Sequence, residues 1–222
     1  MVPPAKTRPR PRPEQVRQAI LDATLELYLE RGYSGTSTDE VAALSSVSKQ
    51  TIYRHFADKD DLIREAIRGL IASAEEQGAP SFDALAESEN LERDLRVFAR
   101  QHLHDVIQSD IMNVRRRIIA EVDRFPEIAR AWYESAPMRG HQKLAACFER
   151  LCERGLLRMS DPLLAAEQFN WLVLSIPLNR AMFVADSVSD TSRHAEYADA
   201  AVDVFLAAYG ASRRVEGPRG VR

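Results

Sequence analysis

Apolar residues recur every three or four positions along most of the chain, which is the spacing of one face of an α-helix. A clear example is a stripe of four apolar residues that Gly32 brings to an end. Its members are Val16, Ile20, Ala23 and Leu27. No run of alternating apolar and polar residues is long enough to form a sheet. The pattern therefore predicts an all-α protein of about nine helices.

The predicted helices form two groups that differ in length. The N-terminal group contains helices at 14–31, at 59–77 and two short ones within 38–56. The C-terminal group contains long helices at 83–109, 111–124, 126–154, 162–184 and 194–211. We expect four segments: a basic, Pro-rich disordered arm (1–13), a three-helix domain (14–58), a larger helical domain (59–211, with 59–77 as its linking helix) and a frayed tail (212–222).

Composition is that of an ordinary globular protein, since 45% of the residues are hydrophobic and 28% are charged. No apolar run is long enough for a membrane span, no apolar segment follows the basic N-terminus, and two cysteines cannot form a disulfide framework. We therefore expect a cytoplasmic protein with no membrane partner. The net charge of −3 argues against a nucleic-acid partner. The Arg-Pro arm, however, is either a solvated tail or a segment that contacts DNA.

Residues 38–56 contain two short helices joined by a tight turn. Helices this short are unstable alone and need a third helix to pack against, which 14–31 supplies. The inward positions of the second short helix are Val47, Ile52 and Phe56. Its outward positions are Lys49, Gln50, Thr51 and Arg54. Their side chains can reach base edges or phosphates, so the unit is typical of a helix-turn-helix that places one helix in the major groove.

A longer segment around this unit carries many positions at fixed spacing. It reads ILDATLELYLERGYSGTSTDEVAALSSVSKQTIYRHFADKDDLIREAI. Its distinctive positions are Gly32-Tyr33, Thr36 to Thr38, Val41-Ala42, Val47-Ser48, Tyr53-Arg54-His55-Phe56, Lys59 and Leu62. With these, the segment resembles the DNA-binding domain of the TetR family of transcriptional regulators. The resemblance implies a cytoplasmic homodimeric repressor that binds a palindromic operator and is released by a small-molecule effector bound in its C-terminal domain.

The resemblance also assigns roles to residues of this chain. Thr38 caps the first short helix and contacts a phosphate. Lys49, Gln50 and Thr51 read bases, whereas Tyr53 and Lys59 contact phosphates. The full expected DNA-binding set is Thr36, Thr38, Ser48, Lys49, Gln50, Thr51, Tyr53, Arg54, His55 and Lys59. Three structural alternatives stay open: Tyr53 as a core residue, His55 as a partner of the helix dipole, and Lys49 with Gln50 as ordinary surface.

One position departs from the family pattern. Family members usually have glycine in the turn between the two short helices, where this chain has Ser46. If this residue has positive φ, serine costs about 1 kcal/mol relative to glycine. The angle between the two short helices therefore depends on how this turn is built.

An Arg-rich helix in the C-terminal half is followed by Phe125-Pro126-Glu127, which opens the next helix. With these features, residues 113–157 resemble the C-terminal domain of AefR-like members of the TetR family. This resemblance implies an architecture and names no ligand. Arg117 and Glu121 are four residues apart in the Arg-rich helix, so we expect them to pair. Pro177 lies inside a predicted helix and should kink it.

An effector pocket requires an apolar lining with a few polar groups. The candidates are His102, Met112, Arg116, Trp132, Tyr133, Phe169, Asn170, Trp171, Met182 and Phe183. Large residues at helical spacing are more often core than pocket. Asn170 and Arg116 are the better candidates, because a buried polar side chain needs a partner.

The last two predicted helices are apolar over wide faces, which one subunit of this size can cover only in part. We therefore expect a four-helix interface across a two-fold axis. Its expected residues are Leu172, Val173, Ile176, Tyr197, Ala201, Val204, Phe205 and Ala208. The alternative is that both faces are buried within one subunit.

Catalytic and metal chemistry have little support in the sequence. Cys147 and Cys152 lie on different sides of a helix, as do His102 and His104, so neither pair suits a metal. There is no glycine-rich phosphate loop and no outstanding Ser-His-Asp spacing. We therefore expect no enzyme, no metal and no cofactor. The alternative function is an all-helical ligand-binding or redox-sensing protein that uses its N-terminal unit as a docking module.

Overall fold

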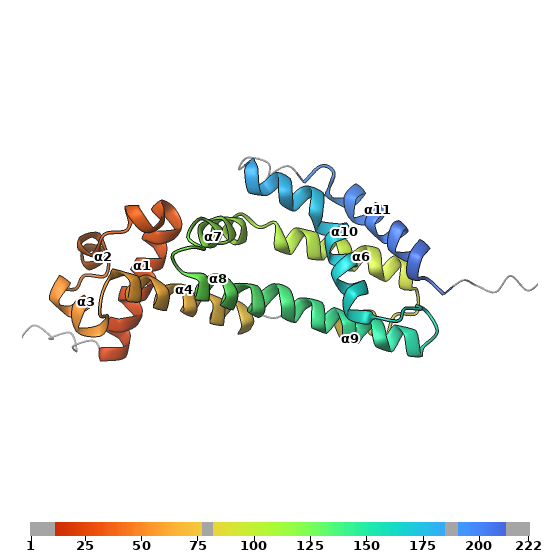
Figure 1. Ribbon diagram of the computed structural model, residues 1–222, viewed down its shortest axis with the longest axis horizontal. Coiled ribbons are helices and arrows are strands. Elements are labelled where there is room, and N and C mark those ends of the chain that lie inside the picture. Colours follow the sequence, from red (N-terminus) through yellow and green to blue (C-terminus); the bar gives the residue numbers. More distant parts are fainter. Residues whose placement is uncertain (1–11, 77–81, 185–190, 212–222) are drawn as a thin grey trace, which may run out of the picture. The chain divides into compact units, whose positions relative to one another are not determined.

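The computed structural model describes residues 12–76, 82–184 and 191–211, and these ranges are all-α, as predicted (Figure 1). The helices are α1 (Pro13–Gly35), α2 (Thr38–Leu44), α3 (Lys49–His55), α4 (Lys59–Glu76), α5 (Phe82–Ala86), α6 (Leu91–Val106), α7 (Ser109–Ala120), α8 (Pro126–Tyr133), α9 (Arg139–Glu153), α10 (Pro162–Phe183) and α11 (His194–Tyr209). The only β-type pairing in these ranges is an isolated bridge between Leu157 and Gly210. Most of the predicted arm and the whole predicted tail lie outside the described residues.

The described ranges contain eleven α-helices, more than the sequence predicts, because two predicted long helices are each divided. The stretch 83–109 divides before Asn90, whose side chain accepts a hydrogen bond from the Arg93 N–H and so begins α6. The stretch 126–154 divides at a π-helical turn, Glu134–Met138. Pro137 lies in this turn and has no N–H for the regular hydrogen-bond ladder.

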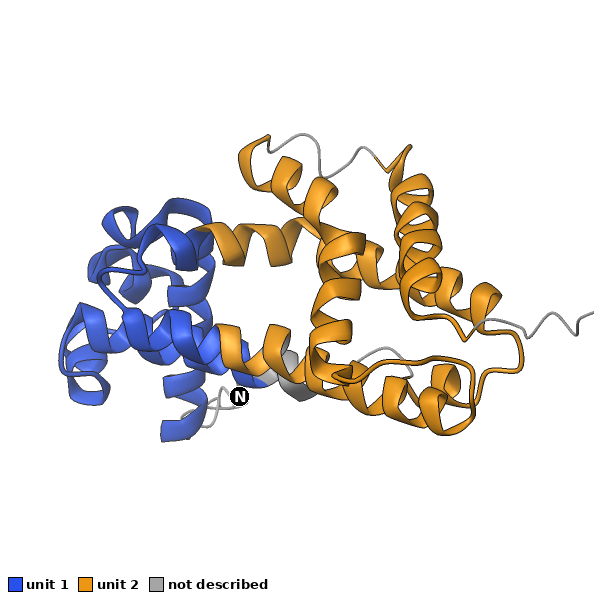
Figure 2. Ribbon diagram, turned by 45° about the vertical axis from the view of Figure 1, so that its right-hand side comes forward, with its two compact units in different colours: residues 1–76, 117–132 blue, residues 77–116, 133–222 orange. Residues whose placement is uncertain are grey.

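The chain folds into two compact units (Figure 2). The first unit contains residues 1–76 and 117–132, and the second contains residues 77–116 and 133–222. The boundary falls inside α7, between Arg116 and Arg117. The first unit thus extends beyond the three-helix segment 14–58, because α4 and the segment 117–132 pack with it.

The first unit is built on α1, which packs against α4 and α2, while α2 packs against α3. Apolar side chains from these four helices form one core cluster that includes Ile20, Ile52, Phe56 and Leu62. The predicted inward positions of α3 are confirmed, since Ile52 and Phe56 are buried and Val47 packs against the cluster. The opposite face of α3 is left to solvent.

The regular conformation of α1 breaks at Gly32, where the sequence predicts a stop. Gly32 has φ +73°, and a Cβ atom there would lie 3.0 Å from Nη1 of Arg117. The Arg117 guanidinium donates to the carbonyl oxygens of Glu30 (2.8 Å) and Leu29 (3.3 Å), so it satisfies the end of the regular helix. The predicted pairing of Arg117 with Glu121 is therefore wrong, because these backbone acceptors hold the guanidinium instead.

The turn between α2 and α3 places Ser46 at φ +56°. Ser46 is the only non-glycine residue with positive φ among those described. Its N–H donates to the carbonyl of Ala43 (3.3 Å), and the Val47 N–H donates to that of Ala42 (3.0 Å). Serine thus occupies a backbone conformation that glycine adopts without steric cost.

The second unit is organised around α10, which packs against α9 and α11, while α11 packs against α6. Three fully buried rings lie at the centre of its core: Phe148, Phe169 and Phe205. Their centroids are 5.0 to 5.9 Å apart, in tilted and edge-on arrangements. Pro177 lies inside α10, and Figure 1 shows this helix bending along its length.

Replacing Ser46 with glycine should raise the free energy of unfolding by about 1 kcal/mol, because glycine adopts positive φ without the clash that a Cβ atom causes. Urea titration followed by circular dichroism measures the change. The matched control is Ser45→Gly, since Ser45 has φ −80° and its hydroxyl donates to the Val41 carbonyl. This control should lose stability. A loss of stability in Ser46→Gly as well would contradict the strain in the turn.

Candidate nucleic-acid interface

Each of the two short helices begins at a serine cap. The Ser37 hydroxyl accepts a hydrogen bond from the Glu40 N–H (3.2 Å) at the start of α2. The Ser48 hydroxyl accepts one from the Thr51 N–H (3.1 Å) at the start of α3. The prediction that Thr38 caps α2 is wrong, because Thr38 is the first residue inside the helix and Ser37 provides the cap.

The outer face of α3 carries most of the side chains predicted to read DNA. Lys49, Gln50, Tyr53 and Arg54 are exposed, as is the cap residue Ser48. Tyr53 is 48% exposed, so it is not a core residue. Its hydroxyl lies 3.4 Å from that of Thr38 in α2, which places these two hydroxyls together at the surface.

Lys49 forms an ion pair across the helix-turn-helix, with its Nζ 2.9 Å from Oδ2 of Asp39. The hydrogen bond to Asp39 raises the pKa of Lys49 above its usual value. Both side chains are exposed, so the pair contributes little to stability. Lys49 can therefore exchange this carboxylate for a phosphate or a base edge at little cost.

The remaining members of the predicted DNA-binding set differ in accessibility. Thr36 is buried, and its hydroxyl donates to the Gly32 carbonyl at 2.8 Å, so the prediction that it contacts DNA is corrected. Thr51 and His55 are half-buried on α3. Lys59 is the half-buried first residue of α4, and the sequence analysis missed its aromatic neighbour.

That neighbour is Tyr33, whose ring centroid lies 4.1 Å from Nζ of Lys59. The sequence marks Tyr33 only as part of the end of α1. The ring also carries the guanidinium of Arg124, whose central carbon lies 3.7 Å from the centroid. Arg124 follows α7, far from Tyr33 in sequence, so no local pattern could have found this contact.

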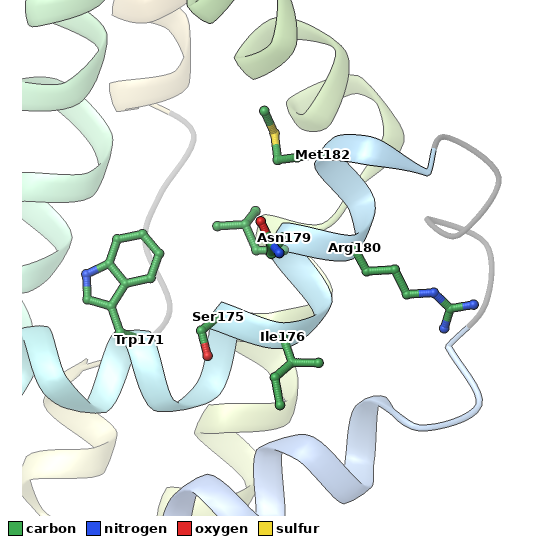
Figure 3. A pocket seen from close by; sticks show the side chains of 7 residues that line it. Trp171, Ser175, Ile176, Asn179, Arg180 and Met182 are labelled. Atoms are coloured by element: carbon green, nitrogen blue, oxygen red, sulfur yellow. The ribbon is translucent and has the colours of Figure 1, made fainter.

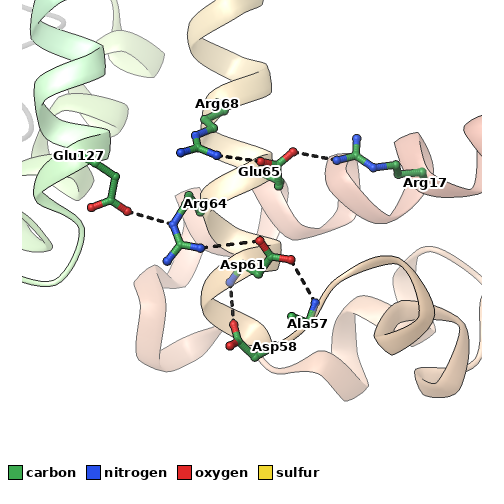
Figure 4. Close-up of polar contacts among 8 residues, drawn as sticks. All are labelled: Arg17, Ala57, Asp58, Asp61, Arg64, Glu65, Arg68 and Glu127. Atoms are coloured by element: carbon green, nitrogen blue, oxygen red, sulfur yellow. Dashed lines mark hydrogen bonds and ion pairs between the residues drawn. The ribbon is translucent and has the colours of Figure 1, made fainter.

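Ion pairs around α4 tie it to its neighbours in the first unit (Figure 4). Arg17 of α1 lies 2.8 Å from Glu65, which also pairs with Arg68 at 3.0 Å. Arg64 lies 2.9 Å from Glu127, the acidic residue of the Phe-Pro-Glu sequence that opens α8. The N-terminal half of α4 is therefore held by α1 on one side and by the start of α8 on the other.

The ten predicted effector residues differ widely in accessibility. Met112 and Phe169 are fully buried in the core, whereas Phe183 is 84% exposed. Trp132 belongs to the first unit and the other nine to the second. Tyr133 is 50% exposed. Met112 and Phe169 are corrected to core residues, because helical spacing marks large side chains without separating core positions from a cavity.

Arg116, His102 and Asn170 find internal partners in the second unit. Arg116 donates to the carbonyl of Ala181 at 2.7 Å. Nε2 of His102 lies 2.9 Å from Oδ1 of Asn170, which connects α6 to α10. This bond satisfies the Oδ1 atom of the buried Asn170 amide without any ligand.

A second histidine completes this polar cluster. Burial lowers the pKa of His102 and of His141 in α9, while hydrogen bonding to Asn170 acts in the opposite direction for both. The neutral imidazole is therefore favoured in the folded protein. His141 is not among the residues predicted from the sequence, although it shares a helix face with the buried Leu144, Ala145 and Phe148.

A shallow cavity of about 690 Å³, widely open to solvent, lies along α10 (Figure 3). Its lining residues are Trp171, Ser175, Ile176, Leu178, Asn179, Arg180 and Met182. Trp171 and Met182 come from the predicted effector set, and Ile176 from the predicted dimer interface. In Figure 3, the Arg180 side chain extends away from Trp171. The cavity is of the size that holds a small organic molecule.

Three residues of the predicted dimer interface are core residues of the subunit. Val173, Ala201 and Phe205 are at most 4% exposed, so they cannot meet a partner, and the prediction is corrected for them. The others form an outer face. Its members are Leu172, Ile176 and Val204, which are 37%, 58% and 55% exposed, with the exposed Ala208 and the half-buried Tyr197.

The two cysteines of α9 have raised pKa values. Burial raises the pKa of Cys147 to about 11, and burial also raises that of Cys152. Because the thiolate is the reactive form, both side chains should react slowly with oxidants at neutral pH. This argues against a redox sensor at either position.

Within the described ranges, no helix is both long and apolar enough to cross a membrane.

Comparison with known protein families gives a match for each of two parts of the chain. Residues 20–66 match the family described as bacterial regulatory proteins, tetR family. Residues 93–211 match the C-terminal domain of AefR-like transcriptional repressors. The chain belongs to the TetR family of transcriptional regulators.

Two solved structures are similar over most of this regulator, and one further relative is similar over about half of it. One from Mesorhizobium loti is 34% identical, with a TM-score of 0.79 over 90% of this chain and 100% of that one. The flavonoid-responsive regulator FrrA is 31% identical, with a TM-score of 0.69 over 93% and 100%. The regulator AcrR from Shigella flexneri is 32% identical over 109 residues. That match spans about half the length of each protein, 49% of this chain and 48% of AcrR.

Acidification should destabilise this TetR-family regulator through the cluster of His102, Asn170 and His141. The folded state keeps both histidines neutral, whereas the unfolded chain binds protons below about pH 6.5. Stability is therefore lost as the pH falls below that value. Thermal unfolding across this range measures the effect, and His102→Gln should weaken it. The matched control His104→Gln changes an exposed histidine of the same helix, and an equal weakening there would contradict the assignment.

Proposed function

We propose that this TetR-family regulator is a repressor that binds a two-fold symmetric operator as a homodimer and leaves it when a small-molecule effector binds. The observation that carries this proposal is the exposed outer face of α3, mounted on a buried frame of α1, α2 and α4. A helix held rigidly by its inner face and free on its outer face fits the major groove.

The residues divide into two roles. Base reading is assigned to Lys49, Gln50 and Thr51, at the N-terminal end of α3, which is the end of a recognition helix that approaches base edges. Phosphate contacts are assigned to residues around this end and at the start of α4. They are Thr38, Ser48, Tyr53, Arg54, His55 and Lys59. Thr36 has no such role, because its hydroxyl is used inside the frame.

The proposed dimer surface is the outer face of α10 and α11. Leu172 and Ile176 lie one turn apart on α10, and Val204 and Ala208 lie one turn apart on α11. The two helices pack against each other, and this proposal takes their exposed apolar residues as one surface. A second copy would bury this surface in a four-helix interface around a two-fold axis.

The proposed effector site is the cavity along α10. Trp171, Leu178 and Met182 provide apolar and aromatic lining, while Ser175 and Asn179 provide uncharged hydrogen-bonding groups. The lining also includes Arg180, so it suits a flat aromatic molecule with hydroxyl groups better than a cationic one. FrrA is named as flavonoid-responsive, and SmeT, which shares the fold, forms a complex with triclosan; flavonoids and triclosan are both aromatic.

The alternative is a ligand-binding or redox-sensing protein whose N-terminal unit only docks to another protein. The raised pKa values of both cysteines disfavour redox sensing. The exposed cations of α3 favour a nucleic-acid partner over a protein one. In this proposal the chain acts in the cytoplasm, by binding and without catalysis.

Selection from a pool of random DNA duplexes tests the proposal. The selected sequences should be two-fold symmetric, with half-sites about 34–36 Å apart or somewhat more, because a dimer places two α3 helices in the major groove. Gln50→Ala should weaken binding to the selected duplex by about 1–3 kcal/mol and relax sequence preference in each half-site.

The matched control for this prediction is Gln101→Ala, since Gln101 is an exposed glutamine of α6 in the second unit. It should bind DNA like the wild type. If no sequence is enriched, the proposal that the protein binds a specific operator is contradicted. If the enriched sequences have no two-fold symmetry, the proposal that it binds as a homodimer is contradicted. Equal losses in Gln50→Ala and Gln101→Ala would contradict base reading by α3.

A thermal-shift screen of flavonoids and halogenated phenols tests the effector site. A compound that raises the unfolding temperature should also weaken binding to the selected duplex, by about 5- to 150-fold for typical allosteric coupling. Trp171→Ala should abolish both effects, because the indole forms one wall of the cavity. The matched control is Phe183→Ala, an exposed aromatic residue of α10 outside the cavity lining. Full retention of both effects in Trp171→Ala would contradict this site.

A further inference from the structure

Tyr33 lies where three segments of the first unit meet. Its hydroxyl donates to Oδ1 of Asp60 at 2.5 Å, which connects the end of α1 to the first turn of α4. Nη2 of Arg124 donates to the Tyr33 hydroxyl oxygen at 2.6 Å and to both Asp60 oxygens at 3.1 and 3.2 Å. The turn between α7 and α8 is therefore bound to the same point.

The ammonium group of Lys59 lies over the ring of Tyr33, with its Nζ atom 4.1 Å from the ring centroid. At this distance the negative face of an aromatic ring attracts a cation and limits where it can go. The attraction does not neutralise the charge, so the ammonium keeps its ability to bind an anion.

The carboxylates nearest to Lys59 in sequence are occupied by other groups (Figure 4). Asp58 accepts a hydrogen bond from the Asp61 N–H, and Asp61 accepts one from the Ala57 N–H and pairs with Arg64. Asp60 is held by Tyr33 and Arg124. Within the described residues, Lys59 accordingly forms no ion pair, and its charge is left for a ligand.

The protonation states agree with this arrangement. The hydrogen bond from Tyr33, followed by that from Arg124, lowers the pKa of Asp60. Burial and the neighbouring Asp60 raise the pKa of Tyr33. Asp60 therefore stays ionised and Tyr33 stays a neutral donor across the physiological range, so the contact between them persists.

The segment that supplies Arg124 is itself fixed to the first unit. On the N-terminal side of Arg124, Arg117 donates to the carbonyl oxygens of Leu29 and Glu30, where the regular part of α1 ends. On the C-terminal side, Glu127 pairs with Arg64 of α4. Phe125 packs its ring 5.9 Å from that of Tyr33. Arg124 thus approaches Tyr33 from a segment anchored on both sides.

We propose that Tyr33 is a positioning residue for DNA binding: its ring aims the Lys59 ammonium at the DNA backbone, and Arg124 holds the ring in place. This inference rests on the proposed function, because it takes Lys59 as a phosphate ligand. It adds a route by which the segment between α7 and α8 sets a DNA contact made by α4.

A double-mutant cycle on the full-length protein tests this, with the selected duplex as probe and a salt series as readout. Lys59→Met should reduce the slope of log affinity against log salt by about 0.9 for each phosphate that Lys59 neutralises. Tyr33→Leu should weaken binding by about 2- to 5-fold per bound protomer with Lys59 present, and have no effect in the Lys59→Met background. Tyr33→Phe keeps the ring and should keep the wild-type salt slope.

The matched control pairs Tyr33→Leu with Lys49→Met, another cation of the interface that does not lie on the ring. These two changes should be additive. Circular dichroism and thermal unfolding check that each variant is folded. If Tyr33→Leu is not, Arg124→Gln replaces it in the cycle, because it removes the guanidinium that holds the ring and should also lose its effect in the Lys59→Met background. An equal effect of Tyr33→Leu in both Lys59 backgrounds would mean a purely structural role, and an unchanged salt slope in Lys59→Met would remove the phosphate contact; either result overturns the inference.

The two proposals fail in different ways. A wild-type protein that binds no duplex at any salt concentration contradicts the proposed function itself. A wild-type protein that binds the selected duplex, with additive effects at Tyr33 and Lys59, contradicts only the positioning role.

Discussion

Burial of Ile52 and Phe56 in the cluster shared with α1 and α4 is the interaction on which the DNA-binding surface depends. α2 and α3 have seven residues each, well below the roughly 12–15 that an isolated helix needs in water. Their conformation is therefore supplied by tertiary contacts made on one side. The same contacts fix which side of α3 faces outward, so a single set of apolar residues determines both the stability and the orientation of the recognition helix.

Features that depend on neighbouring residues could be predicted from the sequence. The helical period located α1, α3 and α4, and it identified Ile52 and Phe56 as inward positions because residues one turn apart share a face. Ser48 stands directly before a helical pattern, the position that a serine cap favours, and its hydroxyl accepts the hydrogen bond that begins α3. Ser46 could be marked as a strained position because the resemblance supplied the residue type expected in that turn, and its positive φ agrees.

Features that depend on distant residues could not be predicted. Helical spacing marks Phe169 and Trp171 equally as large residues, but which of them faces the core depends on how α10 meets α9 and α11. Val173 and Phe205 are buried for the same reason. Thr36 matches the family pattern, yet it is buried, and its hydroxyl donates to the carbonyl of Gly32 at the break in α1. Arg124 reaches Tyr33 across 91 residues, a separation at which sequence periodicity carries no information.

The first compact unit is discontinuous in sequence, and this limits how the protein can be divided. A fragment ending at residue 76 would contain every helix of the helix-turn-helix but would lack the segment 117–132, including the guanidinium that satisfies the end of α1. The DNA-binding part is therefore not a cassette that can be cut out or exchanged by one crossover. A chimera of this regulator with a relative would have to carry two separate stretches from the same parent, so recombination between family members should preserve residues 1–76 and 117–132 together.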